Sequence, residues 1–179
     1  IRQEIGIRTL MNVLGPMTNP AGAKRQVIGV FSRAWQHKMA EVLQLLGSEH
    51  AMVVHSDGLD EIRLDAPTHV VELKNGAITE YDISPGDLGL APRTDADLAG
   101  IVADSAASSL ALVRQSLTDD SSAAADIVAL NAGAAIYVSG VANSLSNGVA
   151  MAQDAISSGQ AKERLAELVR ITSLMSESS

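Results

Sequence analysis

The sequence predicts an α/β fold with a central, mainly parallel sheet, one antiparallel hairpin and helices flanking the sheet. A strand, an amphipathic helix and a second strand follow one another between residues 27 and 55, and such a unit makes a parallel strand pair. Asn75-Gly76 separates two runs of β-forming residues, as in a tight hairpin. From Asp95 onward the chain is rich in helix-forming residues.

The composition suits one domain with an aliphatic core. The chain has 179 residues, of which 46% are hydrophobic but only 2% aromatic. It has no cysteine, which excludes a disulfide framework and a thiolate metal site. A net charge of −8 disfavours general nucleic-acid binding, which depends on Lys and Arg. No apolar run approaches the roughly 20 residues of a membrane span, so we expect a cytoplasmic protein with no membrane or nucleic-acid partner.

The first residues predict helix. Residues 1–19 form two short helical pieces, broken at Gly6 and ended by Gly15-Pro16, because proline cannot continue a helix. Arg2-Gln3-Glu4 already has the character of a helix in progress. We therefore expect the chain to be the C-terminal portion of a longer protein. Residues 17–22 have the composition of a turn.

The strand–helix–strand unit comes next. Residues 27–31 form a short β-rich run, typical of a buried strand. Ser32 is placed to cap the following helix, whose apolar residues recur at helical spacing up to Leu46, and Gly47 suits the position after its end. Residues 51–55 then predict a second buried strand.

The hairpin and the helices complete the predicted elements. The hairpin strands are residues 68–74 and 77–83. Breaks are expected at residues 118–120, at Gly140 and at Gly159. The helices are expected near residues 104–117, 122–139, 146–158 and 160–174.

An acidic pair, Asp60-Glu61, follows the second predicted strand. Ligands of open α/β sheets bind beyond the carboxyl ends of strands. Mg²⁺ prefers oxygen ligands and is commonly shared between one or two carboxylates and substrate phosphates. The position therefore allows a magnesium site, although the spacing alone favours a solvated acidic turn.

Other candidate motifs are weaker. Residues 14–20 are most simply a rigid connector, although Gly15 would let a flat ligand lie against the backbone. Arginine presents a planar fork matched to carboxylate or phosphate, but the basic residues near the start are more often surface residues. The sequence has no paired histidines for zinc, no glycine-rich nucleotide motif and no serine elbow.

Taken together, four stretches resemble the anthranilate phosphoribosyltransferase family in order and spacing. They are residues 5–9, 12–23, 53–61 and 130–137. The resemblance implies transfer of the phosphoribosyl group of phosphoribosyl pyrophosphate to anthranilate, with release of pyrophosphate, in tryptophan biosynthesis. It also implies a small helical domain and a large α/β domain like that of nucleoside phosphorylases and phosphoribosyltransferases. Residues 1–19 would belong partly to the former and residues 20–179 to the latter.

The resemblance also implies a set of site residues. Asp60 and Glu61 match the carboxylates that hold Mg²⁺ on the pyrophosphate, and Arg2 matches the arginine that contacts the anthranilate carboxylate. Gly15 and Pro16 match the segment that lines the anthranilate channel. The resemblance further implies a homodimer and a glycine-rich phosphate loop upstream of Ile1, so we expect this chain alone to be inactive.

Two other functions are possible from the sequence. A pyrimidine nucleoside phosphorylase shares the fold but uses phosphate and a nucleoside; the segment from Gly15 to Asn19 and the acidic pair favour the anthranilate enzyme. A non-catalytic nucleic-acid-binding relative would need a basic groove, against which the net charge of −8 argues.

Overall fold

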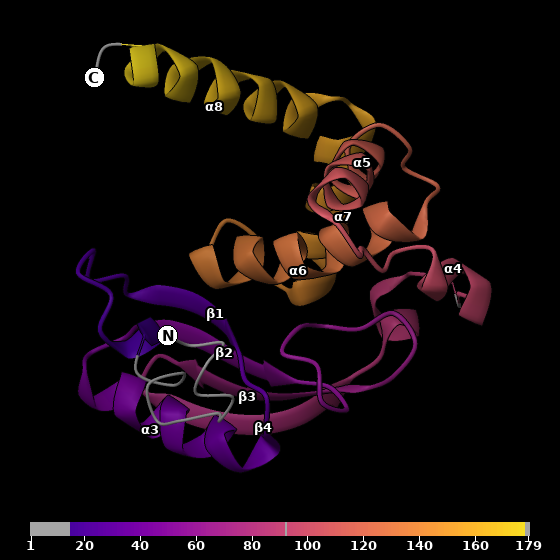
Figure 1. The fold of residues 1–179 in the computed structure, drawn as a ribbon. Coiled ribbons are helices and arrows are strands. Elements are labelled where there is room, and N and C mark those ends of the chain that lie inside the picture. Colours follow the sequence, from indigo (N-terminus) through magenta and orange to yellow (C-terminus); the bar gives the residue numbers. More distant parts are fainter. Residues whose placement is uncertain (1–14, 92, 178–179) are drawn as a thin grey trace. The chain divides into compact units, whose positions relative to one another are not determined.

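A computed structural model describes residues 15–91 and 93–177 of the chain. Its elements divide into two compact units (Figure 1). Of the described residues, the first unit comprises those up to Glu61 together with Thr68–Ile83, and the second comprises Ile62–Pro67 and those from Ser84 onward. The two units are described separately below.

The first unit is built on a four-stranded sheet of order β1-β2-β3-β4. Strands β1 and β2 are parallel, and the other two neighbouring pairs are antiparallel. The α/β class and the hairpin are confirmed, but within the described residues the sheet is mixed rather than mainly parallel. The reason is connectivity, because only the β1–β2 crossover contains an α-helix. The strands are β1 (Arg25–Gly29), β2 (His50–His55), β3 (Thr68–Lys74) and β4 (Ala77–Ile83).

Strand β1 begins earlier than its apolar residues indicate. The predicted strand covered residues 27–31, whereas the paired segment is Arg25–Gly29. Its parallel register starts with Arg25 opposite His50, and Arg25 is an exposed residue at the strand entrance. Hydrophobic residues indicate which part of a strand is buried, but they do not indicate where its backbone pairing begins. The prediction therefore missed the first paired residues of β1.

The crossover consists of a 3₁₀ turn η1 (Arg33–Trp35) and helix α3 (Gln36–Leu45). Ser32 precedes η1, but its side chain makes no capping hydrogen bond, so the predicted cap is wrong. The C-terminal signal is confirmed: Gly47 has φ +76°. The N–H groups of Gly47 and Ser48 donate to the carbonyls of Gln44 and Leu43 at 3.0 and 2.9 Å, which is a Schellman motif.

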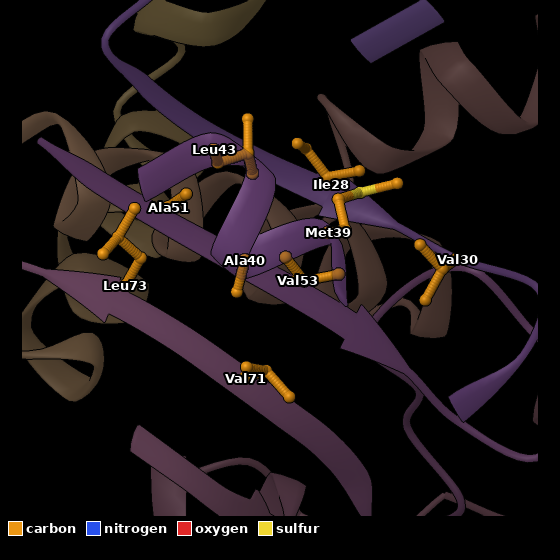
Figure 2. Close-up of a cluster of buried hydrophobic side chains, with 9 residues drawn as sticks. All are labelled: Ile28, Val30, Met39, Ala40, Leu43, Ala51, Val53, Val71 and Leu73. Carbon is orange, nitrogen blue, oxygen red and sulfur yellow. The ribbon is translucent and has the colours of Figure 1, made fainter. Parts of the chain in front are cut away.

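One face of the sheet packs against α3 through aliphatic side chains (Figure 2). Met39, Ala40 and Leu43 of the helix are at most 2% exposed. Strand alternation brings every second residue to this face, which confirms the aliphatic core. The strands contribute Ile28, Ala51, Val53, Val71 and Leu73 to the cluster, and Val30 joins it from the position directly after β1.

The predicted hairpin is confirmed in both strands and in its turn. Strands β3 and β4 pair from Thr68 opposite Ile83 to Lys74 opposite Ala77. The turn residues Asn75 and Gly76 have φ values of 51° and 79°. Positive φ at both central positions is the type I′ geometry that matches strand twist.

The second unit is mainly helical and confirms the predicted helices to within a few residues. Gly140 and Gly159 end helices with φ values of 87° and 81°. A short additional helix follows Thr94, whose side chain accepts from the Asp97 N–H in a capping box. The elements are η2 (Pro85–Leu88), α4 (Asp95–Ala99), α5 (Ala106–Ser116), α6 (Ala123–Ser139), α7 (Leu145–Ser157) and α8 (Gln160–Glu177).

Helices α6 and α7 approach closely because glycines face each other at their crossing. A Cβ atom on Gly133 would lie 2.6 Å from Cα of Val149, and one on Gly148 would overlap the carbonyl of Gly133. Val149 is completely buried. The small-residue stretch around Gly133 thus packs closely, as its composition indicates. Within the described residues, no helix combines the length and apolar character needed to cross a membrane.

Candidate functional site

The acidic pair belongs to a short loop with a defined conformation. Ser56 and Leu59 exchange backbone hydrogen bonds of 2.9 and 2.8 Å. Between them, Asp57 and Gly58 have φ values of 44° and 84°, again the type I′ pattern. The chain therefore makes a tight turn directly after β2, and Asp60 is the next residue after this turn.

The loop is held against the carboxyl ends of β1 and β2. A Cβ atom on Gly29 would overlap the backbone carbonyl of Asp60, so glycine is required for this approach. The ring Nδ1–H of His55 donates to the carbonyl of Val30 at 2.8 Å. The predicted position of the acidic pair, at the exit of a strand, is thus confirmed within the first unit.

The side chains of Asp60 and Glu61 are available for a ligand. Both residues are exposed, and neither forms an ion pair or hydrogen bond with another described residue. Nowhere in the described chain do three or more His, Cys, Asp or Glu residues gather as a metal site. Two exposed carboxylates suit Mg²⁺, which commonly takes one or two protein carboxylates and completes its shell with water and substrate phosphate.

The predicted anthranilate segment lies at the other end of β1. Gly15 and Pro16 are helical and the helix runs on to Met17, so it does not end at Gly15-Pro16 as predicted. The Thr18 N–H still donates to the Gly15 carbonyl at 3.3 Å. Pro16 lacks only its own N–H group, so the other hydrogen bonds of the last turn can still form. Gly15 is exposed, and the space beyond its Cα is open.

Pro16 lines a pocket of about 170 Å³ near the entrance of β1 and β2. The acidic pair lies at the opposite, carboxyl ends of the same parallel strands. The five residues of β1 separate the two ends of that strand, which corresponds to about 13 Å of extended chain. The structure therefore does not bring Pro16 and the acidic pair together. Arg2 lies outside the described residues. The roles of Arg2, Gly15 and Pro16 stay predictions.

A buried polar network on the α3 face escaped the sequence analysis. Gln36 is fully buried, and its Nε2 donates to the carbonyls of Val53 and His69 at 2.8 Å each. Its Oε1 lies 2.8 Å from His69 Nδ1, which must be the protonated nitrogen because Oε1 can only accept. Burial, followed by the positive charge of Arg33, lowers the pKa of His69 below its ordinary value.

A second buried group of polar side chains spans three strands on the opposite face. His50 Nε2 lies 2.7 Å from Glu72 Oε1, and the Tyr81 hydroxyl donates to Glu72 Oε2 at 2.8 Å. His50 and Glu72 are 3% and 7% exposed. Because the partners are 22 and 9 residues apart in sequence, only the strand register joins them.

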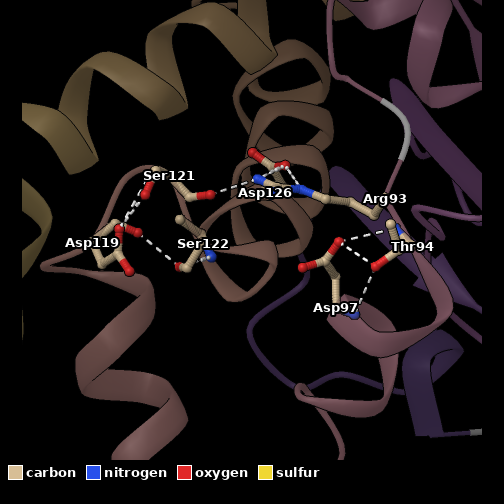
Figure 3. A network of polar contacts seen from close by, with 8 residues as sticks. Arg93, Thr94, Asp97, Asp119, Ser121, Ser122 and Asp126 are labelled. Atoms are coloured by element: carbon tan, nitrogen blue, oxygen red, sulfur yellow. Dashed lines mark hydrogen bonds and ion pairs between the residues drawn. The ribbon is translucent and has the colours of Figure 1, made fainter.

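The second unit contains an ion pair that ties the segment before α4 to the first turn of α6 (Figure 3). Arg93 donates from Nε to Asp126 Oδ2 at 2.7 Å and from a terminal nitrogen to the Ser121 carbonyl at the same distance. Asp126 is 6% exposed. Asp126 also borders a pocket of about 390 Å³ between α6 and α7. Asp60 and Glu61 do not line that pocket.

Comparison with known proteins identifies similar sequences along nearly the whole chain. The sequence model of "Glycosyl transferase family, a/b domain" matches residues 1–162. An anthranilate phosphoribosyltransferase of Teredinibacter turnerae is 54% identical over 178 residues, which are 97% of this chain and 51% of that protein. One of a Marinomonas species is 56% identical over 96% of this chain and 49% of that protein. The chain thus spans about half the length of the curated relatives it matches.

Solved structures show the same fold. The anthranilate phosphoribosyltransferase of Thermus thermophilus is 40% identical with a TM-score of 0.83, over 94% of this chain and 49% of that one. The enzyme of Saccharomyces cerevisiae, solved in complex with PRPP and Mg, is 24% identical with a TM-score of 0.76. That comparison covers 92% of this chain and 47% of the yeast chain, and at this identity it supports the fold alone.

Proposed function

Because this chain belongs to the glycosyl transferase family with an a/b domain, we propose that it forms part of a magnesium-dependent anthranilate phosphoribosyltransferase. The observation that carries the proposal is the exposed pair Asp60-Glu61 at the exit of β2, in a chain more than half identical to relatives of that name. The substrates would be anthranilate and phosphoribosyl pyrophosphate. Tryptophan biosynthesis is the pathway that this reaction serves.

In the proposed reaction, the amine of anthranilate displaces pyrophosphate from the anomeric carbon of the sugar. The carbon becomes positively charged in the transition state while negative charge accumulates on the pyrophosphate. Asp60 and Glu61 would hold Mg²⁺ on that leaving group. The bound ion would neutralise the developing negative charge without proton transfer. Such an ion typically lowers the activation free energy by roughly several kcal/mol.

The chain's own residues contribute mainly position. The tight turn at Asp57-Gly58 and the close approach of Asp60 to Gly29 fix the backbone that carries the two carboxylates. A neutral aromatic amine is a fair nucleophile, so orientation can matter more than a strong base. Arg2 would supply orientation by binding the carboxylate of anthranilate in a planar, two-pronged geometry. Gly15 and Pro16 would line its path.

We further propose a cytoplasmic homodimer in which residues 1–19 belong partly to a small helical domain and residues 20–179 to the large α/β domain. These assignments follow from the family resemblance. Size measurement on the full-length form tests the oligomeric state. In the experiments below, the full-length form is this chain joined to the segment of its relatives that the chain does not match. That segment is supplied by the chain's own gene or by the Teredinibacter turnerae relative.

An assay of the full-length form tests the proposed function. Anthranilate is fluorescent, and its fluorescence should fall with time when phosphoribosyl pyrophosphate and Mg²⁺ are both present. Omission of either one should stop the loss. Thymidine with inorganic phosphate should give no thymine. Phosphorolysis of thymidine without consumption of anthranilate would overturn the proposal in favour of a nucleoside phosphorylase.

A further inference from the structure

We infer that Asn131, on helix α6, is a positioning residue for the acidic pair; the inference rests on the proposed function. Asn131 and Ile62 are 69 residues apart in sequence. The side chain of Asn131 nevertheless binds both backbone groups of Ile62. Its Oδ1 accepts the Ile62 N–H at 3.0 Å, and its Nδ2 donates to the Ile62 carbonyl at 3.1 Å. Ile62 is the residue directly after Glu61.

The orientation of the Asn131 amide is fixed by its own helix. Nδ2 also donates to the carbonyl of Ile127, one turn earlier, at 3.0 Å. The opposite orientation would place the NH₂ group against the Ile62 N–H and the oxygen against two carbonyls. The three hydrogen bonds therefore specify a single arrangement.

Ile62 depends on these hydrogen bonds because it is buried outside regular secondary structure. Its residue exposure is 1%, and it lies in a segment without regular secondary structure. A buried backbone N–H or carbonyl without a hydrogen-bond partner lowers the stability of the fold by as much as the loss of a hydrogen bond. Asn131 is thus the side chain that lets the backbone at Ile62 be buried in the second unit.

The helix that carries Asn131 is itself rigidly packed within this unit. Its neighbour Leu130 is fully buried. Gly133, two residues later, packs so closely on α7 that its Cβ would lie 2.6 Å from Val149. The amide is therefore presented from a well-packed helix and not from a mobile surface.

The connection to the acidic pair is covalent. The N–H of Ile62 belongs to the same planar peptide unit as the carbonyl of Glu61. When Asn131 fixes that plane, it fixes the direction in which the chain leaves Glu61. Groups that hydrogen-bond directly to metal ligands commonly change metal affinity about 10–100-fold when removed. Asn131 acts on Glu61 through one peptide bond, so we expect an effect at the lower end of that range.

Mn²⁺ binding in the presence of inorganic pyrophosphate tests the inference without requiring turnover. Free Mn²⁺ is measured by electron paramagnetic resonance on the full-length form. Asn131→Ala and the milder Asn131→Ser should raise the Mn²⁺ midpoint, the free Mn²⁺ concentration at half-saturation, about tenfold or more. The alanine variant should raise it more than the serine variant. In steady-state assays, the Mg²⁺ midpoint should rise similarly while KM for anthranilate stays within about twofold.

Two control variants separate positioning from general damage. Asn147→Ala removes an exposed asparagine from α7 and should change neither the midpoint nor the melting temperature. Val149→Ala removes buried volume from the α6–α7 crossing and should lower the melting temperature while it leaves the Mn²⁺ midpoint unchanged. The comparison variant Asp60→Asn/Glu61→Gln should abolish the saturable Mn²⁺ binding.

Three results would overturn the inference. If the Asn131 variants bind Mn²⁺ like the unaltered protein while the Asp60/Glu61 variant does not, the metal site exists and Asn131 does not position it. If Val149→Ala shifts the midpoint as much as Asn131→Ala, the effect is general destabilisation. If the Asp60/Glu61 variant also binds Mn²⁺ normally, the proposed metal site itself is wrong and the role of Asn131 fails with it.

Discussion

Gly29, the last residue of β1, lies so close to Asp60 that a Cβ atom would overlap the Asp60 backbone carbonyl. We therefore predict that Gly29→Ala pushes the acidic loop away from the sheet. The free energy of unfolding should fall by about 1–3 kcal/mol, the usual range for overpacking. In the full-length form, the Mg²⁺ midpoint should rise about tenfold.

Gly86→Ala is the matched control, because the space around the Cβ position of Gly86 is open and its φ is not positive. This control should change stability by less than about 0.5 kcal/mol, as for an ordinary surface substitution. If Gly29→Ala behaves like the control in urea denaturation and in the magnesium titration, the backbone does not constrain Asp60.

Acidification should weaken the first unit through His69. Because the folded state lowers the pKa of His69, the unfolded chain takes up its proton first as pH falls below about 6.5. The free energy of unfolding should therefore decrease between pH 7.5 and pH 5.5. Urea denaturation of the full chain at several pH values measures the slope.

His69→Asn isolates this contribution, because its amide nitrogen can still donate toward Gln36 but does not titrate. The slope between pH 7.5 and pH 5.5 should become smaller in His69→Asn than in the unaltered chain. Equal slopes in His69→Asn and the unaltered chain would show that burial does not lower the pKa of His69 in the folded state.

The Arg93–Asp126 pair should stabilise the second unit measurably. The two side chains are 21% and 9% exposed, so removal of one partner leaves a poorly solvated charge. We expect Arg93→Ala to cost about 2–3 kcal/mol, less than for a fully buried pair. A double-mutant cycle with Asp126→Ala should give a coupling energy of about 1 kcal/mol or more.

Arg164→Ala is the comparison for this pair, since Arg164 is 82% exposed beside Glu167. Its substitution should cost no more than about 1 kcal/mol. A coupling energy near zero for Arg93 and Asp126 would mean that their contact does not stabilise the unit.

The 179-residue chain alone should show no anthranilate phosphoribosyltransferase activity, because it spans only about half the length of the relatives it matches. The full-length form should be active in the same fluorescence assay. Consumption of anthranilate by the purified chain alone, dependent on phosphoribosyl pyrophosphate, would contradict this prediction.

Local patterns explain why much of the fold could be predicted. Asn75-Gly76 specifies its turn by backbone conformation alone, and Gly140 and Gly159 end helices for the same reason. The position of Asp60 and Glu61 followed from the strand before them. In each case a few neighbouring residues determine the outcome.

The parts that escaped prediction depend on contacts between distant residues. The partners Gln36 and His69 are 33 residues apart, and Asn131 finds Ile62 across 69 residues. The residues next to Gly29 in the sequence likewise do not show why glycine is needed there. The reason is the close approach of Asp60, which lies far away in the sequence. Strand register and helix packing decide such contacts, and a single sequence does not reveal them.

Magnesium dependence of the Asp60→Asn/Glu61→Gln variant tests the central claim most directly. Turnover of the full-length form is measured across a Mg²⁺ titration at saturating anthranilate, for the unaltered protein and the variant. The account predicts that the variant loses most of its turnover, about a hundredfold or more, and no longer responds to millimolar Mg²⁺ with a saturable rise. An unchanged turnover and an unchanged Mg²⁺ midpoint in a folded variant would contradict it.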